Sequence, residues 1–118
     1  MIEKIEVSGV KYKVEEGFRK YAVKRIGKLD RFLPKKNRKD VVAKIVVTQV
    51  DRAHGNKYEI SAAIDVPGGK VIAAKDEAGN VFAGIDIIEA KLMGQIRRFK
   101  TEKIKHERQG LLKKLLKR

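Results

Sequence analysis

The hydrophobic pattern of the chain predicts an α+β domain in two layers, with a four-stranded sheet and both helices on one face of it. Residues 57–66 alternate between apolar and polar, which is the period of a strand buried on one side. In residues 80–105 apolar side chains recur every three or four positions, which is the period of an amphipathic helix. Three consecutive strands with tight turns predict an antiparallel meander, and a first strand is expected to join it at one side.

The expected order of elements is strand, helix, strand, strand, strand, helix (β-α-β-β-β-α). The strands are expected at residues 1–10, 41–50, 57–66 and 70–75, and the helices at residues 14–32 and 80–105. Pro34 marks a loop over residues 33–40, and turns are expected at residues 52–56 and 67–69. Asn80 is expected to cap the second helix, because its side chain can accept hydrogen bonds from the free backbone amides of the first turn.

A chain of 118 residues is expected to form one domain with a single modest core. We assign residues 1–105 to this domain and residues 106–118 to a basic C-terminal tail that we expect to fray. The short basic amphipathic pattern of the tail leaves open an RNA-contacting extension or a weak membrane-surface segment. No apolar run approaches the ~20 residues that cross a bilayer, and no signal-peptide pattern is present. The absence of cysteine excludes a disulfide framework and suits a cytoplasmic protein.

The chain carries 29 Lys and Arg against 15 Asp and Glu, a formal charge of +14. Such an excess attracts polyanions, and nucleic acid or an anionic membrane are the two classes of partner that it favours. Residues 19–39 hold ten basic residues against one acidic, and residues 91–105 hold six against one. Ordinary solvated helix faces are the alternative, but the i,i+4 pairs of opposite charge that stabilise exposed helices are nearly absent. We therefore expect the two helices to pool their outer cations in one groove.

Other chemistries have weaker support. With two His and no Cys, neither a metal site nor a catalytic dyad is expected. Glu15 and Glu16 suit the first turn of a helix better than a pair of catalytic carboxylates. Three aromatic residues could stack on bases, but their positions favour the core: Tyr21, Phe82 and Phe99.

Three segments carry a resemblance to a known family: FRKYAVKRIGKLDRF at 18–32, IDVPGGKVIAAKDE at 64–77 and NVFAGIDIIEAKLMGQIRRFK at 80–100. Each is loose alone, but their order and spacing together are specific. Residues 2–103 resemble the short form of the ribosome hibernation-promoting factors, also called the ribosome-associated inhibitor A, protein Y or sigma-54 modulation family. The resemblance implies a fold similar to that of a double-stranded-RNA-binding domain.

The resemblance also implies a function. Members of the family bind the decoding channel of the small ribosomal subunit, block mRNA and tRNA, and preserve idle ribosomes in hibernation. The implied partner is therefore the small subunit and its rRNA, with no enzymatic activity, cofactor, metal, membrane or small-molecule substrate. We expect a cytoplasmic protein that is a monomer off the ribosome. A general double-stranded-RNA-binding module, which recognises any A-form duplex by shape, is the alternative.

Alignment with the family assigns rRNA contacts to Arg25, Lys28, Arg31, Lys91 and Arg98. On the second helix Lys91, Arg98 and Lys105 recur every seven residues, so Lys105 is added to the predicted rRNA-binding residues.

The chain departs from the family pattern at three places. Met93 and Gly94 stand where the family often has an acidic residue and Arg, so one cation is missing. Glu102 replaces a family Lys, for which Lys103 or Lys105 could substitute. An extra Ala-Gly at residues 78–79 lengthens the turn before the second helix.

Overall fold

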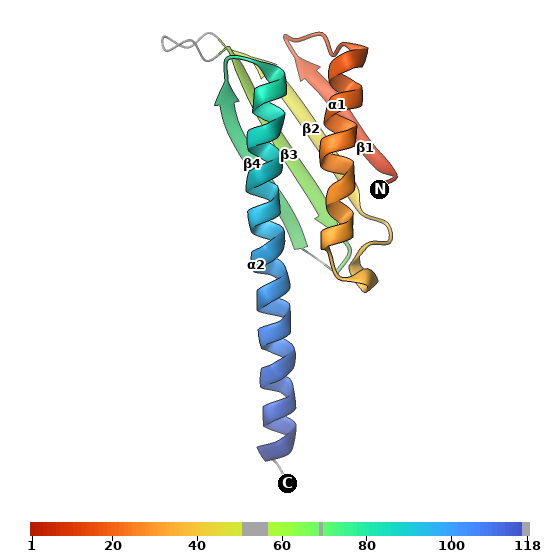
Figure 1. The fold of residues 1–118 in the computed structure, drawn as a ribbon, viewed down its shortest axis with the longest axis vertical. Helices are drawn as coiled ribbons and strands as arrows, with labels where there is room; N and C mark the ends of the chain where they lie inside the picture. The colour runs from red at the N-terminus through yellow and green to blue at the C-terminus, as the bar shows by residue number, and fades with distance from the viewer. Residues whose placement is uncertain (51–56, 69, 117–118) are drawn as a thin grey trace.

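The computed structural model describes residues 1–50, 57–68 and 70–116, and for residues 101–108, 111–114 and 116 it describes the backbone alone. Within these residues, four strands form one mixed sheet, and two α-helices lie across the same face of it (Figure 1). The strands are β1 (Lys4–Val10), β2 (Val42–Gln49), β3 (Tyr58–Val66) and β4 (Lys70–Ala78), and the α-helices are α1 (Glu16–Gly27) and α2 (Val81–Leu116). The predicted fold class and order of elements are confirmed.

The strands lie side by side in the order β1-β2-β3-β4. β2, β3 and β4 form the predicted antiparallel meander, and β1 joins it by pairing in parallel with β2. Parallel neighbours need a crossover connection, and α1 supplies it between β1 and β2. β1 and β4 are consequently the two edge strands of the sheet.

The core lies between the sheet and the two helices. On β3 the alternation predicts the buried side correctly, since Ile60, Ala62, Ile64 and Val66 face the helices. Four residues of the predicted stripe of α2 are equally buried, namely Ile85, Ile88, Leu92 and Ile96, and its fifth residue, Phe99, is half-buried beside the core. The alternate residues of the strands, such as Ser61 and Ala63 of β3, face the opposite side, which we call the open face of the sheet.

The first helix is shorter than predicted. It ends at Gly27 and continues as a 3₁₀-helix, η1 (Lys28–Phe32). The carbonyl of Gly27 accepts a hydrogen bond from the Ile2 backbone N–H at 2.9 Å, so the start of the chain occupies an acceptor that the α-helix would use. A Cβ on Gly27 would lie 2.8 Å from Met1 Cε, which shows how closely the two segments pack.

The loop after the first helix contains a second 3₁₀-helix, η2 (Lys35–Asn37). β4 extends beyond the predicted residue 75 to Ala78. In the turn before β4, Gly68 has φ of 107°, a backbone conformation that favours glycine. The turn predicted at residues 52–56 lies outside the described residues.

The second helix is longer than predicted. Asn80 caps its start as expected, because Asn80 Oδ1 accepts hydrogen bonds from the backbone N–H of Phe82 at 2.8 Å and of Ala83 at 3.4 Å. The helix does not end near Lys105 but runs to Leu116 as one element of 36 residues, and it projects beyond the sheet (Figure 1). Leu, Lys, Arg, Gln and Glu dominate this extension, and all favour helices. The assignment of residues 106–118 to a separate tail stays a prediction.

Candidate nucleic-acid interface

Two predicted cations of the N-terminal half face α2 and meet one carboxylate there. Glu89 Oε1 lies 3.1 Å from Lys28 Nζ, and Glu89 Oε2 lies 3.5 Å from Arg25 Nη1. The side chain of Glu89 is only 17% exposed, against 40% for Arg25 and 33% for Lys28. Because the carboxylate is mostly shielded from water, its attraction for both cations is stronger than in a fully exposed ion pair.

A second carboxylate lies beside Arg25. Asp86 Oδ1 is 3.7 Å from Arg25 Nε and accepts a hydrogen bond from the Tyr21 hydroxyl at 2.5 Å. This hydrogen bond to Asp86 is the largest cause that raises the pKa of the Tyr21 phenol above its ordinary value. The guanidinium of Arg25 also lies 5.2 Å from the centre of the Tyr21 ring. Arg25 is therefore held in place by three neighbours.

The aromatic residues near this seam pack on one another. The rings of Tyr21 and Phe82 meet edge to face at 5.2 Å, and those of Phe18 and Phe82 at 5.9 Å. Phe82 is nevertheless 42% exposed, and Phe99 is half-buried beside the core. These contacts favour the packing role that the sequence suggested over base stacking.

Lys91 lies on the opposite flank of α2, next to the edge strand β4. Its Nζ is 2.8 Å from Asp76 Oδ2 and 3.4 Å from the carbonyl of Lys75. The hydrogen bond from Lys91 is the largest cause that lowers the pKa of the Asp76 carboxyl, and the Glu77 backbone N–H adds to it. Lys91 is thus anchored to the edge of the sheet.

A shallow groove of about 500 Å³ follows this flank. It is lined by Ala73, Ala74, Lys75, Ala90, Lys91, Gly94, Gln95 and Arg98. A neighbouring hollow of about 280 Å³ shares two of these residues, Gln95 and Arg98, and adds Lys70, Ile72 and Phe99. A Cβ on Gly94 would meet no atom within 4 Å, so the groove has room for a longer side chain at this position.

The structure therefore divides the predicted cations into two sets. Arg25 and Lys28 come together in the seam between α1 and α2, whereas Lys91 and Arg98 line the groove beside β4. The expectation of one groove that pools the cations of both helices is wrong, because acidic residues of α2 occupy the seam. Sequence periodicity places residues on a helix face, but it does not say which neighbour covers that face.

The other two predicted residues lie away from these sets. Arg31 is exposed on η1, with its guanidinium 5.2 Å from the centre of the Phe32 ring. The backbone of Lys105 lies in α2, and its side chain is outside the described residues. Contacts of all six predicted residues with rRNA stay a prediction.

The basic loop after η1 is fixed by two of its own residues. Arg38 donates hydrogen bonds to the carbonyls of Leu33 at 2.9 Å and Arg31 at 2.7 Å. Asn37 is buried, and its Nδ2 donates to the carbonyl of Pro67 at 3.3 Å, which ties the loop to the turn before β4. Arg38 therefore holds the backbone of this loop in place.

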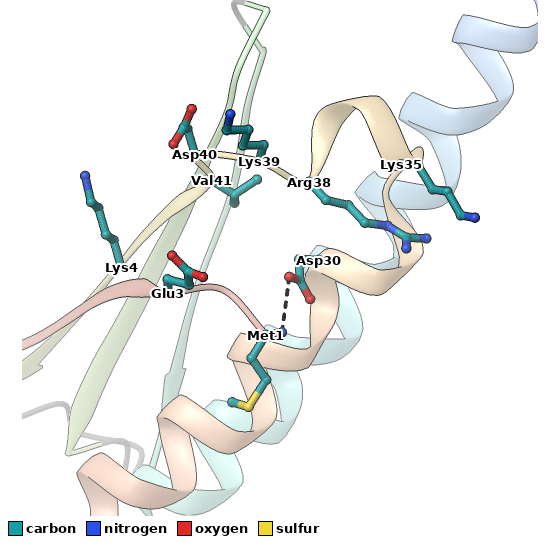
Figure 2. A pocket seen from close by; sticks show the side chains of 9 residues that line it. All are labelled: Met1, Glu3, Lys4, Asp30, Lys35, Arg38, Lys39, Asp40 and Val41. Carbon is teal, nitrogen blue, oxygen red and sulfur yellow. Dashed lines mark ion pairs between the residues drawn. The ribbon is translucent and has the colours of Figure 1, made fainter.

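A hollow of about 470 Å³ lies between this loop and the N-terminal strand (Figure 2). It is lined by Met1, Glu3, Lys4, Asp30, Lys35, Arg38, Lys39, Asp40 and Val41. The amino group of Met1 pairs with Asp30 at 3.5 Å, the dashed line in Figure 2. Because both cations and carboxylates line it, this hollow lacks the single sign of charge that attracts a polyanion.

Neither a metal centre nor a membrane span is found in the part of the chain that the structure describes. Its His, Cys, Asp and Glu residues form no group of three or more that could hold a metal ion. Its helices also include none that is long and apolar enough to cross a membrane.

Three relatives place this geometry in context. The chain is 28% identical over 106 residues to the ribosome hibernation promotion factor of Deinococcus radiodurans. The aligned stretch covers 89% of this chain and 53% of that protein. The chain thus spans about half the length of this relative. The N-terminal domain of Thermus thermophilus Protein Y superposes with a TM-score of 0.65 and 25% identity, over 81% of this chain and 98% of that one. A ribosomal subunit interface protein from Coxiella burnetii shares the fold, with a TM-score of 0.65 and 21% identity, over 83% of this chain and 98% of that one.

A family model extends across nearly the whole sheet-and-helix domain. The model described as sigma 54 modulation protein / S30EA ribosomal protein matches residues 5–104. The match includes all three segments that carry the resemblance inferred from the sequence. The chain belongs to the sigma 54 modulation protein / S30EA ribosomal protein family.

Proposed function

We propose that this protein is a non-enzymatic ribosome-binding factor that occupies the decoding channel of the small subunit. There it blocks mRNA and tRNA, inhibits translation and preserves idle ribosomes in the cytoplasm. Membership of the S30EA ribosomal protein family over residues 5–104 is the observation that carries the proposal. The name of the Deinococcus radiodurans relative, a ribosome hibernation promotion factor, supports it.

The charge distribution supports an rRNA partner. Arg31 and Arg98 are exposed, whereas Lys28 and Lys91 have carboxylate partners that phosphate oxygens would replace. Each phosphate contact adds ~0.7–0.9 to the slope of log affinity against log salt. Binding should therefore weaken steeply as the salt concentration rises.

Sedimentation of ribosomes through sucrose tests the proposal. We expect the protein to sediment with the small subunit at moderate salt and to be released by added mRNA and tRNA. Recovery of the protein in the supernatant at moderate salt would refute ribosome binding, and retention despite mRNA and tRNA would refute the site.

A charge-reversal pair tests the groove beside β4. Lys91→Glu with Arg98→Glu should abolish sedimentation with ribosomes while the circular dichroism spectrum is unchanged. The matched control is Lys4→Glu with Lys44→Glu, since both residues are exposed and lie on the open face of the sheet. An equal loss of sedimentation with ribosomes in both double variants would mean that net charge, not this groove, determines binding.

The second candidate is a general double-stranded-RNA-binding module, which the sheet-and-two-helix architecture and the charge would support. Such a module binds A-form RNA through phosphate and 2′-hydroxyl contacts. Equal affinity for a plain RNA duplex and for ribosomes would favour it over the proposed factor.

A further inference from the structure

The seam between α1 and α2 contains an arrangement that RNA binding alone does not explain. Two cations assigned to rRNA contacts, Arg25 and Lys28, are already paired with a carboxylate of the same protein. Glu89 reaches both at once, and it is the least exposed member of the group. A phosphate that approaches either cation competes with Glu89 for its N–H donors and is also repelled by the carboxylate.

The energetic consequence differs between RNA partners. On a short generic duplex few phosphates are within reach of the protein. The free energy lost when the ion pairs of Glu89 break is therefore offset by few new contacts. On a large cognate surface many contacts form together, including those of exposed cations such as Arg98, and the same loss is more easily offset. A carboxylate within a basic surface therefore lowers affinity for generic RNA more than for the cognate site.

We propose that Glu89 is a specificity-determining residue that withholds Arg25 and Lys28 from the phosphates of generic RNA. The inference rests on the proposed function, in which the cognate partner is rRNA. On the ribosome the two cations exchange Glu89 for phosphate oxygens, and in free solution they remain paired. Asp86 keeps Arg25 oriented through both states, because it lies beside the guanidinium and is fixed by Tyr21.

An inter-helix ion pair could instead serve folding alone, and Glu89→Gln separates the two roles. Glutamine keeps the shape of the side chain but removes the charge, and the buried stripe of α2 still holds the helix to the core. A folding role predicts a lower melting temperature and no effect on RNA affinity beyond that of net charge. A specificity role predicts tighter binding to RNA that the protein should otherwise reject.

The test compares Glu89→Gln with Glu6→Gln, which makes the same change of charge on the open face of the sheet. The probe is a plain A-form RNA duplex, and its affinity is measured over a series of salt concentrations. Glu89→Gln should bind about two- to tenfold more tightly than the control. The decrease of its log affinity with log salt concentration should become steeper, by ~0.7–0.9 for each cation released. Equal affinities in the two variants, or weaker binding by Glu89→Gln, would overturn the proposal.

Lys28→Gln provides a second test. In the Glu89→Gln background, Lys28→Gln should remove most of the gain in affinity for the RNA duplex, because Lys28 is the closer of the two partners of Glu89. In the wild-type background it should weaken duplex binding less than Arg98→Gln does, since Arg98 is exposed and Lys28 is withheld. An equal or larger loss from Lys28→Gln would contradict withholding even if Glu89→Gln failed to fold.

Sedimentation of the wild-type protein with ribosomes is measured alongside. If the wild type fails to sediment, the proposed function falls, whatever the duplex affinities are. If it sediments and the two variants bind the duplex equally, the role of Glu89 alone falls. The ratio of ribosome to duplex affinity should decrease in Glu89→Gln relative to Glu6→Gln.

Discussion

Gln95 of α2 pairs with both backbone groups of Ala73 in the edge strand β4. Its Oε1 accepts a hydrogen bond from the Ala73 N–H at 3.1 Å, and its Nε2 donates to the Ala73 carbonyl. At the other edge, Arg19 Nη1 donates to the Val7 carbonyl of β1 at 3.4 Å. Side chains of the two helices thus occupy backbone groups at both edges, where another chain could otherwise add a strand.

Replacement of Gln95 by Ala should expose the edge of β4. We expect faster hydrogen exchange of the Ala73 amide, because its acceptor is removed, and a concentration-dependent increase in mass. Exchange is followed by NMR and mass by light scattering after gel filtration. Gln109→Ala is the matched control, since Gln109 is an exposed glutamine of the same helix. If the Ala73 amide exchanges equally in both variants, the side chain of Gln95 does not protect this edge.

Gly84 allows α2 to approach the sheet closely. A Cβ at this position would overlap Ile60 Cδ1 and lie 3.1 Å from Ile60 Cγ1, and Ile60 is fully buried. Gly84→Ala should therefore lower the free energy of unfolding by ~1–3 kcal/mol, despite the better helix propensity of Ala. Urea denaturation measures this. Adding Ile60→Val should recover part of the loss, and a double variant less stable than both single variants would contradict the proposed overlap.

Gly94 is the matched contrast within the same helix. A Cβ there would meet no atom within 4 Å, so only the backbone term remains. Gly94→Ala should raise the free energy of unfolding by ~1 kcal/mol, because glycine in a helix is disfavoured by about this amount. A destabilising effect in urea denaturation would mean that this turn of α2 needs the conformational freedom of glycine.

The fold could be predicted from the sequence because its main signals are local. Alternation on β3 and the apolar stripe of α2 depend on the period of one element, and both identify the buried side correctly. The end of α1 depends instead on a distant contact, the hydrogen bond from Ile2 to Gly27. Gly27 is a local signal that weakens the helix, but the pattern of residues around it does not reveal the partner at the start of the chain.

The candidate site was predictable in composition but not in arrangement. The sequence identified Arg25, Lys28 and Lys91 as members of basic segments, yet each has a carboxylate partner in the structure. These partners lie far apart along the chain, so the i,i+4 spacing used to look for ion pairs could not reveal them. Gln95 belongs to one of the segments that carry the family resemblance, but a polar residue on a helix flank gives no signal for the strand edge that it covers.

Gly94 also permits a test of the missing cation. Gly94→Arg places a guanidinium beside the groove that contains Lys91 and Arg98, at the position where the resemblance inferred from the sequence predicts an Arg. Affinity for ribosomes should rise by about two- to tenfold relative to Gly94→Ala, which shares the gain in helix stability but not the charge. Sedimentation over a salt series measures both affinity and slope. Equal binding by the two variants would mean that this groove does not face rRNA.

The ion pair between Lys91 and Asp76 should make stability depend on pH. The hydrogen bond from Lys91 lowers the pKa of Asp76 below its ordinary value of 3.8, so the folded state holds this proton less tightly than the unfolded state. The resulting stabilisation is present above pH 3.8 and is lost as the pH falls through the lowered pKa of the folded state. Asp76→Asn should therefore be less stable than the wild type at neutral pH, and the two should converge in acid.

Urea denaturation at a series of pH values measures this difference. Asp65→Asn is the control, because Asp65 is exposed on the open face of the sheet and its replacement should change stability little at any pH. A difference between wild type and Asp76→Asn that stays constant down to the acid limit would show that Asp76 acts through something other than its charge. Since Asp76 is the carboxylate that anchors Lys91, Asp76→Asn should also release Lys91 and raise affinity for generic RNA, as we expect Glu89→Gln to do for Lys28.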